Sequence, residues 1–388
     1  MIIVGIRRSI AALTAPVVAG ICLLPILSGH PWRHEVFWAL FSYQRVTILV
    51  AVVAAGVGGY EGYRWSSYRP SIALSPRRLA VPANLIIFSL VWHLVVFLGF
   101  AVVVAGIAVR NGAPLFYDWE SPLSLATSCA AIAFANTTGF VAGWRLRSPA
   151  VAPIAAMGTY ASYILLASGG YEKATRLGGA GSSLLGLRIS TAVTVGRLLV
   201  YGAGAALVAV VVSRARAQSE LPPPRPARLL LSAGFVLGVL VLANAPGQIF
   251  ERRQVQVDCG GGHPELCLNR GYESERLDLA AKYGALTTTM ERADLPAPHG
   301  FSQDPTDLSR VTFEPPGVQQ NPDALIANFM HYYFDKTKCT LKTPAQRKAF
   351  VELGTWLAIG QGRRAPKSSN VTVEDVRSAI TELRTCTT

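Results

Sequence analysis

Seven stretches of this 388-residue chain are long and apolar enough to cross a lipid bilayer as helices. A bilayer core needs about 20 residues of helix, because an irregular chain would leave its peptide groups unbonded in lipid. Charged residues make up only 15% of the chain, against about 25% in an average soluble domain. A segment from Val36 to Phe41 leads into the second stretch, and its aromatic residues Phe37, Trp38 and Phe41, with Tyr43 after it, suit a headgroup interface. The predicted spans lie near residues 9–29, 46–60, 82–108, 122–143, 149–168, 190–212 and 228–248.

The basic residues are distributed unevenly and predict a topology. Residues 1–250 hold 19 basic residues (Lys and Arg) against 6 acidic residues (Asp and Glu), whereas residues 251–388 hold 17 basic and 17 acidic residues. A nucleic-acid partner is therefore not expected, because a protein that binds DNA or RNA would carry its basic face on the soluble domain. Twelve basic residues fall in one alternating set of loops and six in the other. The positive-inside rule then predicts a multi-pass protein of the cell membrane, with a cytoplasmic N-terminus and an extracytoplasmic C-terminal domain.

The predicted spans and topology divide the chain into four segments. These are a six-helix core over 1–213, a Pro-rich cytoplasmic linker over 214–227, a seventh span over 228–250 and an outer domain over 251–388. The expected fold is an all-α polytopic membrane protein of about seven spans with a mainly α outer domain. Helix-start patterns at Asn321-Pro322 and Thr343-Pro344 support this. The outer helices are expected near 274–292, 322–335, 344–360 and 372–385, with extended pieces at 254–257 and 311–314.

Cysteine placement predicts disulfides in the outer domain. Four cysteines in a non-cytoplasmic domain indicate two bridges with three possible connectivities. Sequence proximity favours Cys259 with Cys267 and Cys339 with Cys386. A metal site is the alternative, since Cys259, His263 and Cys267 are spaced four apart, but Gly260–Gly262 and Pro264 disfavour the helix that such a site needs. The disulfide is favoured and no metal is predicted.

Three polar residues inside the predicted spans are candidates for a translocation path: His93, Asn136 and Arg197. Ionisable groups at this depth are costly and are often functional. The alternative is that they bond neighbouring helices. No predicted span contains Asp or Glu at mid-depth, which argues against an ion-coupled carrier.

The connection after the second span carries an isolated acid at the helix end. An interfacial loop explains its arginines and aromatic residues. It does not explain Glu61, three residues before Arg64.

This region resembles the permease subunits of type-two ABC exporters, in particular an actinobacterial group. The resemblance rests on Ala54-Ala55-Gly56 through Tyr60-Glu61 and Arg64, then Ser71 to Arg78, Ala135 to Trp144, and Pro149 to Pro153. It covers residues 1–213; the seventh span and the outer domain exceed the usual six-helix core. It implies a separate ABC ATPase subunit, a second permease copy or related permease, and a loop that couples to the ATPase. The coupling residues would be Glu61, Tyr63, Arg64, Arg69, Arg77 and Arg78.

The predicted function is the transmembrane subunit of an ATP-driven exporter, with no enzyme activity or cofactor of its own. ATP and Mg²⁺ belong to the partner, because Gly178 to Ser183 lacks the lysine of a phosphate-binding loop. The main alternative is a non-transporting sensor, immunity or assembly protein whose outer domain binds a partner. A membrane enzyme using the cluster from Asp258 to Cys267 is a third possibility.

Overall fold

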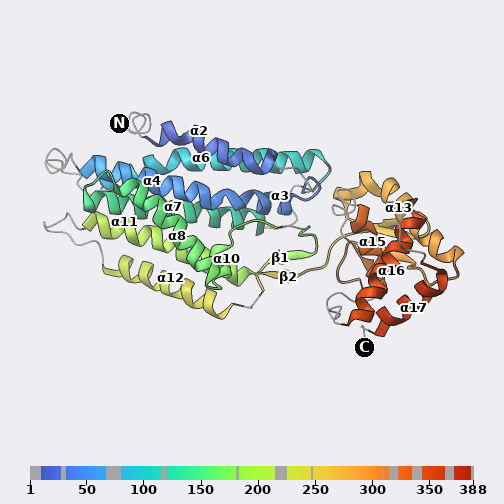
Figure 1. Cartoon of the computed structure of the whole chain (residues 1–388). Helices are drawn as coiled ribbons and strands as arrows, with labels where there is room; N and C mark the ends of the chain where they lie inside the picture. Colours follow the sequence, from blue (N-terminus) through green and yellow to red (C-terminus); the bar gives the residue numbers. More distant parts are fainter. Residues whose placement is uncertain are drawn as a thin grey trace.

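A computed structural model describes residues 10–27, 32–66, 80–114, 120–180, 183–214, 225–245, 248–307, 309–313, 322–333, 343–362 and 371–385. A bundle of long helices holds the first part of the chain, and a smaller region of helices and short strands holds the C-terminal part (Figure 1). The bundle helices are α2 (Ala11–Leu27), α3 (Val36–Tyr43), α4 (Thr47–Ser66), α6 (Ala80–Arg110), α7 (Glu120–Leu146), α8 (Val151–Ser168), α10 (Thr191–Leu198), α11 (Gly204–Arg214) and α12 (Arg225–Asn244).

Five helices are long and apolar enough to span a membrane: Val36–Ser66, Ile86–Arg110, Ser121–Leu146, Val151–Ser168 and Thr191–Val210. The chain is thus a multi-pass membrane protein by length and composition. The first and seventh predicted spans correspond to the shorter apolar helices Ala11–Leu27 and Leu229–Asn244. The second span starts ten residues earlier than predicted, because the aromatic segment α3 runs through the 3-10 turn η1 (Gln44–Val46) into α4.

The helix ends agree with the alternating arrangement predicted from the loops. The end of α4 and the starts of α6, α8 and α12 lie at one end of the bundle, and the C-terminal region lies at the other (Figure 1). Which end faces the cytoplasm stays a prediction.

Helices α4 and α7 approach so closely that glycine is required at their contact. A Cβ on Gly139 would overlap the carbonyl oxygen of Ala55, and one on Gly143 would overlap that of Gly59. The two pairs advance in the same direction along both helices, so α4 and α7 run parallel. Gly58 and Gly62 of α4 meet the backbone of α7 in the same way. This is the small-residue packing expected between membrane helices.

The sixth predicted span is not a uniform α-helix. Between α10 and α11 lies the π-helical turn η2 (Leu199–Ala203). Helix α12 packs on this segment, where a Cβ on Gly238 would come within 2.8 Å of the Leu199 Cβ and 2.9 Å of the Gly196 carbonyl oxygen. The seventh predicted span is thereby packed against the sixth.

The C-terminal region contains a small sheet that the sequence patterns did not predict. Strands β3 (Asp258–Gly260), β4 (Glu265–Leu268), β5 (Gly300–Ser302) and β6 (Val311–Thr312) pair in that order. The first pair is antiparallel and the other two are parallel. Residues 254–257, expected to be extended, form no strand, while β6 lies within the predicted piece 311–314. A separate pair joins β1 (Leu187–Ile189) to β2 (Phe250–Arg252).

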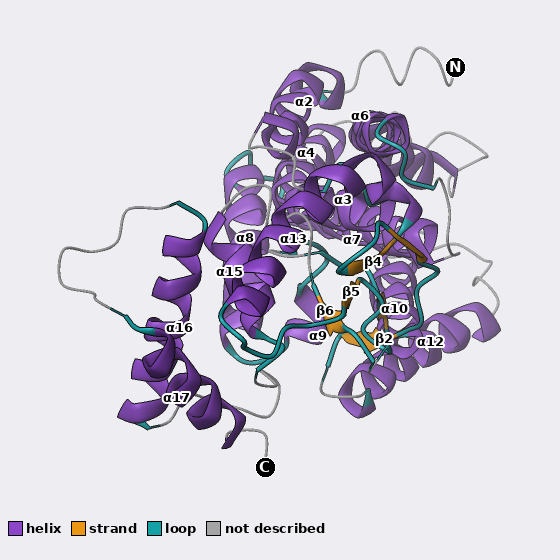
Figure 2. Ribbon diagram, turned by 90° about the vertical axis from the view of Figure 1, so that its right-hand side faces the viewer, coloured by secondary structure: helices purple, strands orange, loops and turns teal. Residues whose placement is uncertain are grey.

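Four helices of this region match the prediction: α13 (Arg276–Arg292), α15 (Pro322–Met330), α16 (Pro344–Gly360) and α17 (Val373–Arg384). The Thr343 hydroxyl accepts the Gln346 N–H at 3.1 Å, and the Gln346 side chain accepts the Thr343 N–H at 3.3 Å. These two bonds form a capping box and confirm the helix start predicted at Thr343-Pro344. Figure 2 shows α16 and α17 together at one side of the region, where they pack on each other.

The described part of the C-terminal region shares one hydrophobic core. It includes buried side chains from Leu266 to Leu383. Aromatic rings form its centre, with Tyr283 and Phe301 centroids 4.2 Å apart and Phe329 5.8 Å from Phe301. The region therefore has its own core, while the predicted domain boundaries themselves stay predictions.

Candidate functional site

Glu61, the isolated acid of the predicted coupling loop, lies inside the protein. Its side chain is 3% exposed, and its Oε1 accepts the backbone N–H of Ile10 at 2.6 Å. Ile10 directly precedes α2, so the carboxylate bonds a donor at the N-terminus of that helix, where negative charge is favoured. Glu61 therefore attaches α4 to α2.

The other predicted coupling residues are less fully described. The Tyr63 ring lies edge-on to Tyr60, with centroids 6.2 Å apart. Arg64 is half-buried at the end of α4. Arg69, Arg77 and Arg78 lie outside the described residues.

Two of the three path candidates belong to one buried polar network. His93 is fully buried, and its Nδ1 donates to the Ser89 carbonyl at 3.0 Å, which fixes the proton on Nδ1. Its Nε2 lies 3.4 Å from the Thr14 hydroxyl. Ser89 also bonds Asn136, whose Nδ2 donates to the Ser89 hydroxyl at 2.9 Å. The network links α2, α6 and α7 and satisfies groups that would be costly unpaired.

Sequence reasoning missed Ser89, which joins His93 to Asn136. The available signal was its position four residues before His93, one helical turn away on the same face.

Arg197 lies elsewhere and bonds a different segment. It is 2% exposed, and its Nε donates to the Lys173 carbonyl at 2.5 Å. The Tyr201 hydroxyl donates to the Ala174 carbonyl at 2.9 Å. Both acceptors lie in the short helix α9 (Glu172–Thr175), so the sixth predicted span holds this segment in place.

The predicted bridge between Cys259 and Cys267 is confirmed. The two residues face each other across β3 and β4. The neighbouring Glu265 carboxylate accepts from Arg310 at 2.6 Å. The sulfurs are thus joined to each other, and the carboxylate has a cationic partner. Cys339 and Cys386 lie outside the described residues.

Reduction of this bridge provides a test of its contribution. Closing a short loop contributes about 2–3 kcal/mol by restricting the unfolded chain. We expect a reductant, or Cys259→Ser with Cys267→Ser, to lower the melting temperature of the full chain by several degrees. Differential scanning fluorimetry measures the shift, and a non-reducing peptide map must show Cys259 linked to Cys267.

A buried carboxylate joins the helical bundle to the C-terminal region. Glu35 precedes α3 and is 6% exposed. Its Oε1 accepts the Tyr272 hydroxyl at 2.6 Å and also the Ser183 hydroxyl. Its Oε2 accepts the Leu184 N–H at 3.1 Å. One side chain thus joins three segments far apart in the sequence.

His34 makes a second contact at this junction. Its Nδ1 donates to the Gly271 carbonyl at 2.9 Å, and its Nε2 lies 3.8 Å from the Glu275 carboxylate. A Cβ on Gly271 would overlap the His34 carbonyl oxygen, so the approach requires glycine there. We call the contacts of His34 and Glu35 with Gly271, Tyr272 and Glu275 the junction.

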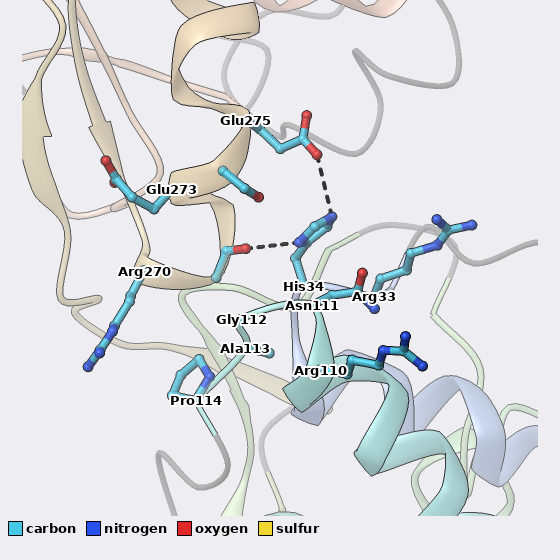
Figure 3. Close-up of a pocket in the computed structure, with 12 residues that line it drawn as sticks. Arg33, His34, Arg110, Asn111, Gly112, Ala113, Pro114, Arg270, Glu273 and Glu275 are labelled. Carbon is cyan, nitrogen blue, oxygen red and sulfur yellow. Dashed lines mark hydrogen bonds and ion pairs between the residues drawn. The ribbon is translucent and has the colours of Figure 1, made fainter.

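A pocket of about 810 Å³ opens beside the junction (Figure 3). One wall comes from the loop before α3 and the C-terminal end of α6, and the other from the 3-10 segment η3 (Arg270–Glu275). Sequence reasoning missed both junction and pocket, since their residues lie in loops, a helix end and a 3-10 segment that carry no motif. The pocket is lined by Arg33, His34, Arg110, Asn111, Gly112, Ala113, Pro114, Arg270, Gly271, Glu273, Ser274 and Glu275.

No protein-family model, no curated protein and no solved structure matches the chain.

Proposed function

We propose that the chain is the transmembrane subunit of an ABC exporter. The observation that carries the proposal is the attachment of α4. The Glu61 carboxylate bonds it to the start of α2, and glycines place its backbone against α7. Gly59 also meets α8, where an added Cβ would lie 3.2 Å from the Ala152 Cα. A movement of the connection after Ser66 would therefore be transmitted through α4 to α2, α7 and α8.

In this proposal a separate ATPase subunit binds that connection and hydrolyses ATP with Mg²⁺. Substrate moves between two copies of the chain, or between this chain and a related one. The alternation between inward and outward states passes through α4. Tight interhelical packing suits such a transmission, because packed helices move as units.

The junction favours a second candidate function, that of a non-transporting sensor or assembly protein. Glu35 and His34 connect the C-terminal region to α3, which continues into α4. Binding of a partner to the C-terminal region would then bias the bundle without any transport.

One purification distinguishes the two functions. The tagged full chain is purified from its native membrane in mild detergent, and co-purifying proteins are identified by mass spectrometry. The exporter proposal predicts a stoichiometric ABC ATPase whose turnover falls at least tenfold in Arg77→Glu with Arg78→Glu. Arg145→Gln, an exposed arginine at the end of α7, is the matched control and should retain the ATPase.

The opposite result is equally informative. If a partner binds the C-terminal region and no ATPase is retained, the exporter proposal is wrong and the sensor function is favoured. Glu61→Gln is examined separately by its melting temperature, because Glu61 is part of the fold.

A further inference from the structure

The pocket beside the junction carries more positive charge than its own acids neutralise. Arg33, Arg110 and Arg270 are exposed at its rim. Within the described ranges no carboxylate forms an ion pair with any of the three. Figure 3 shows the guanidinium groups of Arg33 and Arg110 extending toward the same side, while Arg270 extends the other way. Two positively charged groups on the same side of the pocket favour the binding of an anion between them.

The acids of the pocket have other partners. Glu273 accepts two hydrogen bonds from Arg276, at 2.7 and 2.8 Å. These bonds from Arg276 hold the pKa of Glu273 below its ordinary value, so the group is ionised and paired. Glu275 lies against His34 at 3.8 Å. Neither acid is directed at Arg33 or Arg110 (Figure 3).

The depth of the pocket indicates which anions can reach it. Arg110 is the last residue of the candidate span Ile86–Arg110. The end of a spanning helix lies where the hydrocarbon core meets the headgroups, and the phosphates of lipids lie at that level. The guanidinium fork matches phosphate oxygens in a bidentate geometry. A volume of about 810 Å³ also falls within the range of about 300–1,000 Å³ found for small-ligand sites.

We propose that this pocket binds a phosphate-bearing anion, held by Arg33 and Arg110 of the bundle, with η3 of the C-terminal region forming the opposite wall of the pocket. A phospholipid headgroup is the source that the membrane supplies at this depth, and a soluble phosphate compound carries the same chemistry. The inference does not depend on the transport proposal. Because the pocket has walls from both parts of the protein, its ligand stabilises the junction.

The test uses the full-length protein in detergent and measures its melting temperature during titration with defined probes. The lipid probes are phosphatidylglycerol, which is anionic, and phosphatidylcholine, which is zwitterionic. The soluble probes are inorganic phosphate and glycerol 3-phosphate. Native mass spectrometry counts the lipids that remain bound.

Phosphatidylglycerol should raise the melting temperature at lower concentrations than phosphatidylcholine. The double variant Arg33→Gln with Arg110→Gln should need about 100-fold more phosphatidylglycerol, since each charged hydrogen-bonding group contributes about tenfold. Arg33→Lys with Arg110→Lys, which keeps the charge, should recover part of the response. Arg252→Gln is the matched control, because Arg252 is exposed in β2 and does not line the pocket.

Two results overturn the proposal: a double variant that responds to every probe as the unmodified protein does, or equal responses to the two lipids with no response to soluble phosphate. An arginine-dependent response to soluble phosphate alone supports the anion site and assigns its ligand to a soluble phosphate compound. Equal melting temperatures of all variants without probe show that each one folds.

Discussion

Gly143→Ala should abolish the folded bundle or lower its free energy of unfolding by about 3 kcal/mol or more, at the upper end of overpacking effects. The added Cβ would overlap the Gly59 carbonyl oxygen, and the Tyr63 backbone nitrogen would lie 2.9 Å away. Both partners are backbone atoms, so no side-chain rotation relieves the overlap. Size-exclusion chromatography of the full chain and its melting temperature measure the effect.

Gly158→Ala provides the matched control in a neighbouring helix. Among the residues that the structure describes, no heavy atom outside its own helical backbone lies within 4 Å of a Cβ built at Gly158 in α8. The same substitution there should leave the melting temperature unchanged or raise it, because alanine favours helix by about 1 kcal/mol over glycine. Equal melting temperatures for the two variants would disprove the close contact between α4 and α7.

Glu35→Ala should release the C-terminal region from the bundle. The substitution leaves the donors of Tyr272, Ser183 and Leu184 without their acceptor in a buried site, at a cost of about 3 kcal/mol or more. Hydrogen exchange should accelerate in residues 183–187 and 270–275 while α7 keeps its protection. Glu35→Gln, which keeps one acceptor oxygen, should have a smaller effect.

Glu251→Ala is the control for a carboxylate at the same end of the molecule. Glu251 pairs with Arg188 at 3.1 Å in a partly exposed position, and such a pair contributes at most about 1 kcal/mol. A double-mutant cycle of Glu35→Gln with Tyr272→Phe measures their coupling directly. Strict additivity of the two substitutions would contradict the hydrogen bond between them.

Hydropathy and capping patterns were sufficient to predict most helices. The long apolar stretches correspond to α4, α6, α7 and α8, and the Thr343 cap marks the start of α16. These signals are local, because a membrane helix satisfies its backbone within its own segment and a cap acts over three residues. The Cys259–Cys267 bridge was predictable for the same reason, as the two residues are eight apart.

Contacts between distant segments were not predictable in this way. Strands of two to four residues are too short to show an alternation of apolar and polar residues. Strand β4 also pairs in parallel with β5, although helix α13 separates the two strands in the sequence. The junction depends on His34 and Glu35, two loop residues without a motif, whose partners Gly271 and Tyr272 lie 237 residues later in the sequence. Glu61 was singled out as unusual, but its partner at Ile10 lies 51 residues earlier.

The spacing of the Glu35 contacts along the chain determines when the protein can complete its assembly. The Ser183 partner lies 148 residues after Glu35, and the Tyr272 partner 237 residues after it. During synthesis the carboxylate emerges long before either hydroxyl, and until then water or lipid headgroups must solvate it. The last bond forms only after the final apolar helix has been made and η3 has folded. A chain that stops before residue 272 lacks the Tyr272 hydroxyl. Its Glu35 carboxylate, just before the second apolar helix, therefore accepts one hydrogen bond fewer than in the folded structure.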